Sequence, residues 1–201
     1  MKMIITDFYS NTNVLHCPNN NSPEYAFIGR SNVGKSSLIN MILNQKIART
    51  SSKPGKTQLI NHMVINNSWS LVDLPGYGYA KISKTKKAEI LKMTREYFLQ
   101  RGKPLAAVFF LIDIRIPPQK IDLEWMKWLV KNQIYFIRTF TKSDNLNASK
   151  VQQKIKEYNK HMNDNSWGKI PESITTSSKK RIGKDEILQK IIQLNTLFQN
   201  M

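Results

Sequence analysis

The octapeptide GRSNVGKS at residues 29–36 constrains the fold of this 201-residue chain more than any other sequence feature. It matches G-x-x-x-x-G-K-S, a pattern in which a glycine-rich loop joins a buried strand to a helix. The two glycines allow backbone torsions that other residues disfavour, so the loop N–H groups can surround phosphate oxygens. The lysine would reach the β- and γ-phosphates, and the serine hydroxyl would bind Mg²⁺ at the helix N-terminus. We therefore predict a P-loop made of Gly29, Arg30, Ser31, Asn32, Val33, Gly34, Lys35 and Ser36.

Short apolar runs alternate with amphipathic stretches along the rest of the chain. Strands are predicted at 25–28, 59–65, 69–72, 106–112, 134–140 and 173–176. Helices are predicted at 36–43, 85–101, 121–130 and 185–198, and one more follows the S-x-x-Q capping pattern of Ser149 and Gln152. This alternation indicates an α/β domain with a mostly parallel six-stranded sheet and helices on both faces. The polar, Asn-rich residues 1–23 are expected to be an N-terminal extension, and residues 24–201 a single domain.

Ligands of such sheets bind beyond the carboxyl ends of the strands, where three more motifs lie. A D-x-x-G motif follows the strand at 69–72; Asp73 would hold Mg²⁺ through a water molecule, and the Gly76 N–H would meet the γ-phosphate. A T-K-x-D form of the guanine motif N-K-x-D follows the strand at 134–140. The residues predicted to bind nucleotide after these strands and the last one are Asp73, Leu74, Pro75, Gly76, Thr141, Lys142, Ser143, Asp144, Thr176, Ser177 and Ser178.

The guanine motif predicts the base and its environment. The Asp144 carboxylate can accept hydrogen bonds from N1–H and N2–H₂ of guanine, and adenine lacks this pair of donors. The Lys142 stem would pack over the base plane, and backbone N–H groups of residues 176–178 would reach guanine O6. Thr141 stands in place of the consensus Asn, which is expected to weaken a hydrogen bond between loops.

The polar loop at 44–58 holds the candidates for a second Mg²⁺ ligand. Thr57 is the preferred candidate and Thr50 the alternative. We expect the loop to become ordered around Thr57 when a γ-phosphate is bound. The residues of this region predicted to contact nucleotide are Gly55, Lys56, Thr57, Gln58 and Leu59.

The charge balance predicts a polyanionic partner. Lys and Arg number 31 against 14 Asp and Glu, a net charge of +17. Solubility of a small domain requires only ~2–8 charges, so RNA, DNA or an anionic membrane surface is favoured, with Lys as a general solubilising residue as the alternative. The single cysteine excludes an internal disulfide, and no apolar run approaches the ~20 residues of a membrane helix. We expect no membrane span and a cytoplasmic protein, with an organelle matrix as the alternative.

Four strings resemble the EngB family of GTPases, also called the YihA/YsxC type: GRSNVGKSSLIN (29–40), ARTSSKPGKTQ (48–58), DLPGYGYAK (73–81) and TKSD (141–144). The resemblance runs from about residue 24 to the last helix. It implies a Ras-like P-loop GTPase that binds GTP or GDP with Mg²⁺. It also implies a bacterial-type protein, expected to be monomeric, that assists assembly of the large ribosomal subunit and is needed for normal septation. Ser143 replaces the usual Ala of the family, whereas Thr141 is common in it.

The predicted reaction is the hydrolysis of GTP to GDP and phosphate, with Lys35, Asn32, Thr57 and Gly76 as catalytic candidates. Ras-like enzymes place a Gln directly after D-x-x-G to orient water, and Tyr77 at this position cannot do so. We therefore predict slow intrinsic hydrolysis that a partner or a cation accelerates. Asn32 is the candidate K⁺ ligand, because some GTPases use an Asn here; an Asn that only hydrogen-bonds within its loop is the alternative.

Two groups of cations are candidates for contact with ribosomal RNA. They are the helix residues Lys84, Lys86, Lys87, Lys92 and Arg95, for which a solvated face is an equal alternative, and the cluster Lys179, Lys180, Arg181 and Lys184. An RNA-binding structural factor that uses GTP as a structural ligand, with negligible turnover, is the competing function. A P-loop kinase or ATPase is disfavoured by Asp144.

Overall fold

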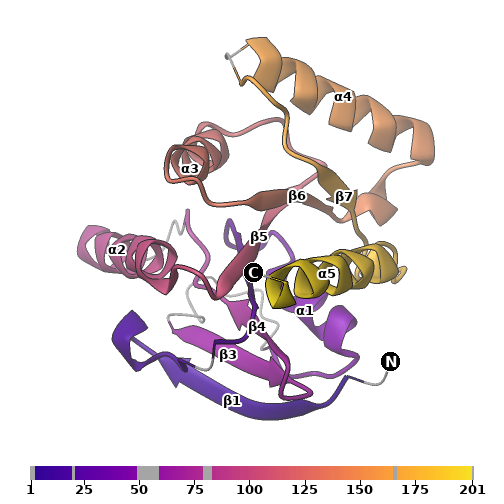
Figure 1. The fold of residues 1–201 in the computed structure, drawn as a ribbon. Helices are drawn as coiled ribbons and strands as arrows, with labels where there is room; N and C mark the ends of the chain where they lie inside the picture. Colours follow the sequence, from indigo (N-terminus) through magenta and orange to yellow (C-terminus); the bar gives the residue numbers. More distant parts are fainter. Residues whose placement is uncertain (1–2, 20, 49–58, 79–82, 165–166, 201) are drawn as a thin grey trace.

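The computed structural model describes residues 3–19, 21–48, 59–78, 83–164 and 167–200. These residues form a seven-stranded sheet, ordered β1-β3-β4-β2-β5-β6-β7, with five α-helices around it (Figure 1). The strands are β1 (Ile5–Asn11), β2 (Glu24–Gly29), β3 (Ile60–Ile65), β4 (Trp69–Asp73), β5 (Leu105–Asp113), β6 (Phe136–Thr141) and β7 (Ser173–Thr175). The helices are α1 (Lys35–Leu43), α2 (Lys84–Arg101), α3 (Lys120–Lys131), α4 (Ala148–Asp164) and α5 (Lys184–Gln199), with 3₁₀ turns η1 (Val14–His16) and η2 (Ser143–Asn145).

Five strands from β4 to β7 pair in parallel, and β3 and β1 add antiparallel pairs at one edge. The predicted mostly parallel sheet is confirmed, but it has seven strands instead of six. The additional strand is β1, which lies in the segment expected as an N-terminal extension and pairs with β3 from Ile5 to Asn11. Most of its residues are exposed, so it lacks the apolar alternation by which a strand is found in a sequence.

Apolar clusters cover both faces of the sheet, which confirms the prediction of helices on both sides. Helices α1 and α5 pack on one face, for example through Leu38 and Ile191. Helices α2, α3 and α4 pack on the other face through residues that include Phe98, Trp125 and Tyr158. The central strands β2 and β5 are therefore buried on both faces, which explains their continuous apolar sequences.

The start of α4 differs from the capping prediction. The Asn147 side chain accepts a hydrogen bond from the Lys150 N–H at 2.8 Å, whereas Ser149 already lies inside the helix. Ser149 as the N-cap is therefore wrong. Asn and Ser cap helices about equally well. Which of Asn147 and Ser149 becomes the N-cap therefore depends on the path of the chain between β6 and α4.

The parallel strands bring the loops that follow β2, β4, β6 and β7 to one edge of the sheet. This edge contains the described part of the predicted nucleotide site. Within the described ranges, no helix has the length and apolar character needed to cross a membrane.

Candidate functional site

The P-loop connects β2 to α1, and its path depends on two glycines. Gly34, directly before α1, has φ 105°, a left-handed torsion that side chains disfavour, and Asn32 has φ 63°. At Gly29 the constraint is space, because a Cβ there would lie 2.9 Å from both the Cβ and the carbonyl oxygen of Leu111 on β5. The sequence thus lets the loop turn sharply while it stays close to the sheet.

Lys35 and Asp73 form a buried ion pair at the base of this loop. Lys35 begins α1, Asp73 ends β4, and the Lys35 Nζ donates to Asp73 Oδ1. Their side chains are 8% and 5% exposed, and Ser36 is half-buried on the first turn of α1. The site therefore offers an ammonium group, a carboxylate and a hydroxyl beside a helix N-terminus, whose dipole favours anions.

The loop after β4 lies against the P-loop through backbone hydrogen bonds. The Ser31 N–H donates to the Tyr77 carbonyl oxygen at 2.9 Å, and the Tyr77 N–H donates to the Gly29 carbonyl oxygen at 3.2 Å. Nearer to β4, the Leu74 N–H donates to the carbonyl oxygen of Phe27 on β2 at 3.1 Å. Gly76 is buried between these anchored positions, so its N–H lies in a loop that is fixed at both ends.

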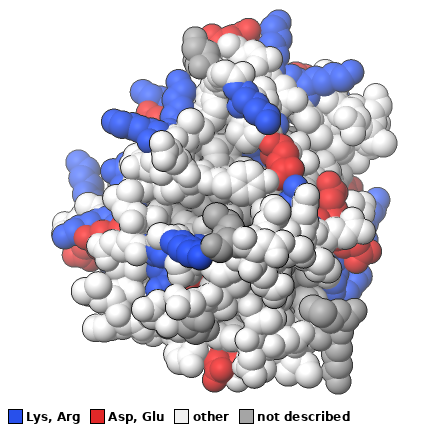
Figure 2. Space-filling model, viewed as in Figure 1, with Lys and Arg blue, Asp and Glu red and all other residues white. Residues whose placement is uncertain are grey.

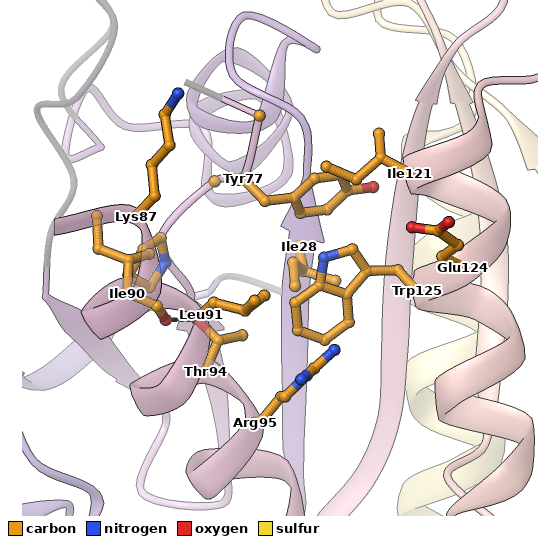
Figure 3. A pocket seen from close by; sticks show the side chains of 13 residues that line it. Ile28, Tyr77, Lys87, Ile90, Leu91, Thr94, Arg95, Ile121, Glu124 and Trp125 are labelled. Atoms are coloured by element: carbon orange, nitrogen blue, oxygen red, sulfur yellow. Dashed lines mark hydrogen bonds between the residues drawn. The ribbon is translucent and has the colours of Figure 1, made fainter. Parts of the chain in front are cut away.

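The Tyr77 side chain lies against α3 (Figure 3). Its hydroxyl donates to Asp122 Oδ1 at 2.9 Å, and its ring centroid lies 5.6 Å from that of Trp125 and 6.0 Å from that of Phe110. Burial, and next to it the negative charge of Asp122, raises the pKa of Tyr77 well above its usual value. The phenol is therefore a stable hydrogen-bond donor and is unsuited to deprotonating a water molecule.

A cavity of about 440 Å³ opens between the loop after β4, α2 and α3 (Figure 3). Its lining includes Pro75, Leu91 and Trp125, with Lys87 and Arg95 as its cations. The Arg95 guanidinium lies 5.6 Å from the ring centroids of both tryptophans of α3. The lining contains no residue from Arg30 to Ser36, so the P-loop does not form this cavity, although the cavity shares Gly76 with the predicted phosphate site.

The loop after β6 is joined to the P-loop at two points. The Thr141 hydroxyl donates to the Val33 carbonyl oxygen at 2.6 Å, and Lys142 Nζ donates to the Asn32 carbonyl oxygen at 2.6 Å. Thr141 thus forms a hydrogen bond between the two loops in place of the consensus Asn.

Asp144 is held by the loop after β7. Its Oδ1 accepts from the Ser177 hydroxyl at 2.7 Å, and the Ser143 N–H donates to the Thr176 carbonyl oxygen at 3.2 Å. The hydrogen bond from Ser177 is the main reason why the pKa of Asp144 lies below its usual value. The carboxylate is thus ionised at neutral pH and can accept two hydrogen bonds. Ser178, the next residue, is half-buried.

Asp113 is a site residue that the sequence analysis missed. Its Oδ2 accepts from Lys142 Nζ at 2.9 Å and from Arg115 Nη2 at 2.7 Å. Burial favours the neutral carboxyl, but the hydrogen bonds from Arg115 and Lys142 outweigh it and lower its pKa. Asp113 ends β5, directly after the apolar run at 106–112, so the rule that searches strand ends would have found it.

The predicted basic cluster lies near Asp144. The proximity of Lys179 and Lys180 contributes to the lowered pKa of Asp144. Burial and the neighbouring Arg181 lower the pKa of Lys184. On the face shown in Figure 2, the Lys and Arg side chains lie mainly near the rim and alternate with carboxylates, so the charge there is dispersed.

Several predicted residues belong to the segment at 49–58. Gly55, Lys56, Thr57, Gln58 and the alternative Thr50 lie outside the described residues, and Leu59 directly precedes β3. The described residues before this segment are fixed to α1, because Asn40 Oδ1 accepts from the N–H groups of Ile47 at 3.0 Å and Ala48 at 2.8 Å.

Comparison with known sequences agrees with this geometry. A family model described as a 50S ribosome-binding GTPase matches residues 24–142. The probable GTP-binding protein EngB of Flavobacterium johnsoniae is 51% identical over 203 residues, which cover 100% of this chain and 96% of that protein.

Solved structures share the fold. A crystal structure of a probable GTP-binding protein engB has a TM-score of 0.66 at 22% identity and covers 86% of this chain and 98% of its own. Era in complex with MgGDPNP and a segment of 16S ribosomal RNA has a TM-score of 0.68 at 22% identity, with 86% and 56% covered. At these identities the likeness establishes the P-loop GTPase fold alone.

Proposed function

Because the chain belongs to the EngB family of GTP-binding proteins, we propose that it is a slow GTPase whose nucleotide state controls its binding to the large ribosomal subunit during assembly. The observation that carries this proposal is the meeting of the P-loop, the D-x-x-G loop and the T-K-x-D loop at one edge of the sheet. The proposal includes a cytoplasmic monomer and a requirement for septation. It also assigns residues 24–201 to one G domain, to which β1 contributes an edge strand.

Guanine selection is assigned to Asp144. Its carboxylate accepts from N1–H and N2–H₂, while the Ser177 hydroxyl holds one of its oxygens in place. Lys142 would cover the base with its stem, and its two hydrogen bonds, to Asn32 and Asp113, support this position. ATP has no pair of donors on this edge for the Asp144 carboxylate, so GTP is the substrate that this residue selects.

Phosphate and metal binding are assigned to the P-loop and its neighbours. Lys35 and the loop N–H groups would neutralise the phosphates. Mg²⁺ prefers oxygen ligands and needs few from the protein when phosphates supply others, which suits the Ser36 hydroxyl, Thr57, and Asp73 acting through water. When bound, Mg²⁺ supplies positive charge that stabilises the phosphoryl group during transfer. In the described ranges no three His, Cys, Asp or Glu side chains cluster as a metal site, and this type of site requires none.

Slow hydrolysis is supported by the orientation of Tyr77. Its hydroxyl donates to Asp122 and its ring packs on Trp125, so it offers no group that positions water. A cation could supply the missing charge. Asn32 is exposed, and its side-chain amide makes no hydrogen bond to the described residues, which suits it as a K⁺ ligand.

A ribosomal partner is supported by the charge of the chain and by the family description. The +17 net charge and the exposed cations on α2 and beside Asp144 suit contact with RNA phosphates. The matching family model is described as a 50S ribosome-binding GTPase. Era, which shares the fold, was crystallised with a segment of ribosomal RNA.

The test is co-sedimentation with large ribosomal subunits in GDP and in a non-hydrolysable GTP analogue, at several salt concentrations. We expect tighter binding with the analogue and a linear fall of the logarithm of the binding constant with the logarithm of salt concentration. Equal binding with both nucleotides would favour the second candidate, an RNA-binding factor with GTP as a structural ligand, which the orientation of Tyr77 also suits. Absence of binding would remove the ribosomal role and leave GTP binding intact.

A further inference from the structure

A single buried carboxylate on α3 connects the two loops at the phosphate side. Asp122 Oδ2 accepts from Arg30 Nε at 3.0 Å, and Asp122 Oδ1 accepts from the Tyr77 hydroxyl at 2.9 Å. Arg30 belongs to the P-loop, and Tyr77 directly follows the glycine of D-x-x-G. Asp122 is 1% exposed, so its charge depends on these two partners and on the dipole of the α3 N-terminus.

Packing of α3 does not require this carboxylate. The buried face of α3 otherwise consists of Trp125, Met126 and Leu129, and an apolar residue at position 122 would avoid the cost of burying a charge. A buried charge whose partners both come from loops of the nucleotide site instead points to a role in arranging those loops.

The backbone supports the same connection. Arg30 and Tyr77 form a parallel bridge, in which Ser31 donates to the Tyr77 carbonyl oxygen and Tyr77 donates to Gly29. The two loops are therefore joined on one side by backbone hydrogen bonds and on the other by the side chains that meet at Asp122. Movement of the loop after β4, which contains Gly76 and is called the Gly76 loop below, relative to the P-loop would have to alter both connections.

We propose that Asp122 is a positioning residue for the nucleotide state: it fixes the distance between the P-loop and the Gly76 loop through Arg30 and Tyr77. The inference rests on the proposed GTP–GDP switch. The γ-phosphate is the only part of GTP that would contact Gly76. The contacts of Asp122 with Arg30 and Tyr77 should therefore strengthen the binding of GTP and have little effect on the binding of GDP. Loss of these contacts lowers the preference for the triphosphate.

The test measures dissociation constants for GDP and a non-hydrolysable GTP analogue with purified protein in Mg²⁺. Tyr77→Phe retains the ring and removes only the hydroxyl, while Asp122→Asn retains the shape and removes the charge. For each variant we expect the affinity for the analogue to fall about fivefold or more relative to that for GDP, in the usual range of coupling between sites. Lys127→Gln is the matched control, because it removes one charge from the exposed side of the same helix, outside the cavity lining, and should leave the ratio unchanged.

A purely structural role gives a different result. If the variants bind GDP and the analogue with equally reduced affinity, or keep the wild-type ratio, the proposal is overturned. If Asp122→Asn fails to fold, Tyr77→Phe decides alone, since the ion pair with Arg30 remains in it. No ribosome enters the measurement, so failure of the ribosomal role would leave this ratio unaffected.

Discussion

The Thr141 hydroxyl donates to the carbonyl oxygen of Val33 at 2.6 Å, across 108 positions of sequence. Both groups are buried, so the bond ties the loop that follows β6 to the P-loop without competition from water. Together with the Lys142 hydrogen bond to the Asn32 carbonyl oxygen, it holds these two loops at a set distance.

Loss of this bond should weaken nucleotide binding. Thr141→Val keeps the shape but leaves a buried carbonyl oxygen without its partner, and we expect a fall of about five- to tenfold in GTP and GDP affinity. Thr141→Ser should restore most of it. Thr139→Val on the same strand is the control, because Thr139 is also buried and its hydroxyl donates to Ile137 of its own strand. An equal loss of affinity in both valine variants would mean that disturbance of β6, and not loss of the bond to Val33, causes the effect.

Asp144→Asn should change the base that is preferred. The amide offers one acceptor and one donor where the carboxylate offers two acceptors, so we expect GTP affinity to fall about a hundredfold. Xanthine presents N1–H and a carbonyl oxygen at position 2, so affinity for XTP should rise. Competition among GTP, XTP and ITP measures this, and a variant that still prefers GTP over XTP would contradict the assignment of Asp144.

Asp113→Asn should act on both nucleotides alike, because it affects Lys142 at the base and leaves the γ-phosphate side unchanged. Removal of the charge weakens the hold on Lys142, and we expect GDP and GTP affinities to fall about fivefold each. Arg115→Gln is the control, since the Arg115 side chain is 44% exposed and its loss leaves the Asp113–Lys142 pair in place. A change in the ratio of GDP affinity to GTP affinity would refute the assignment of Asp113 to the base side alone.

Hydrolysis should depend on K⁺. Asn32→Gly tolerates the positive φ and keeps the carbonyl oxygen that Lys142 contacts, while it removes the side-chain amide. In wild type we expect at least about a tenfold higher rate in KCl than in NaCl, well below the effect of an arginine finger. The variant should lose this difference. Equal wild-type rates in the two salts would exclude the K⁺ role of Asn32.

Stability should fall in acid through Glu24. This fully buried carboxylate accepts from Tyr97 at 2.8 Å and from Arg101, and His62 Nε2 lies 3.3 Å away. Burial favours its neutral form, but the nearby His62 and the hydrogen bonds from Arg101 outweigh this and lower its pKa below the ordinary 4.5. A lowered folded pKa means that its contribution to stability is complete above 4.5 and is lost as the pH falls through the folded value.

Urea unfolding from about pH 3 to about pH 7 would measure this contribution. Glu24→Gln should lose about 3–5 kcal/mol at neutral pH, because Arg101 keeps a buried charge without its anion. The variant should also show a shallower acid slope than wild type. Glu89→Gln, on the exposed side of α2, should behave as wild type, and an unchanged slope in Glu24→Gln would disprove the role of Glu24.

Most elements of the fold could be predicted because their signals are local. The run at 106–112 became β5, since a strand covered on both faces must be apolar throughout. Strand β1 could not be found in this way, because it is exposed and its backbone pairs with β3, whose residues are distant in sequence. The N-cap of α4 was missed for a related reason. Asn147 and Ser149 are both adequate capping residues, and only the path of the chain between β6 and α4 selects Asn147.

The sequence by itself determined the motifs of the site: a P-loop with its two glycines, the D-x-x-G and T-K-x-D strings, and the family of the chain. These are properties of short segments, in which residue type and spacing are sufficient. Only the tertiary structure decided which side chains meet across the sheet. Asp113 holds Lys142, and Asp122 joins Arg30 to Tyr77. Such contacts depend on the distance and angle between separate strands and helices, and no spacing along one chain encodes them locally.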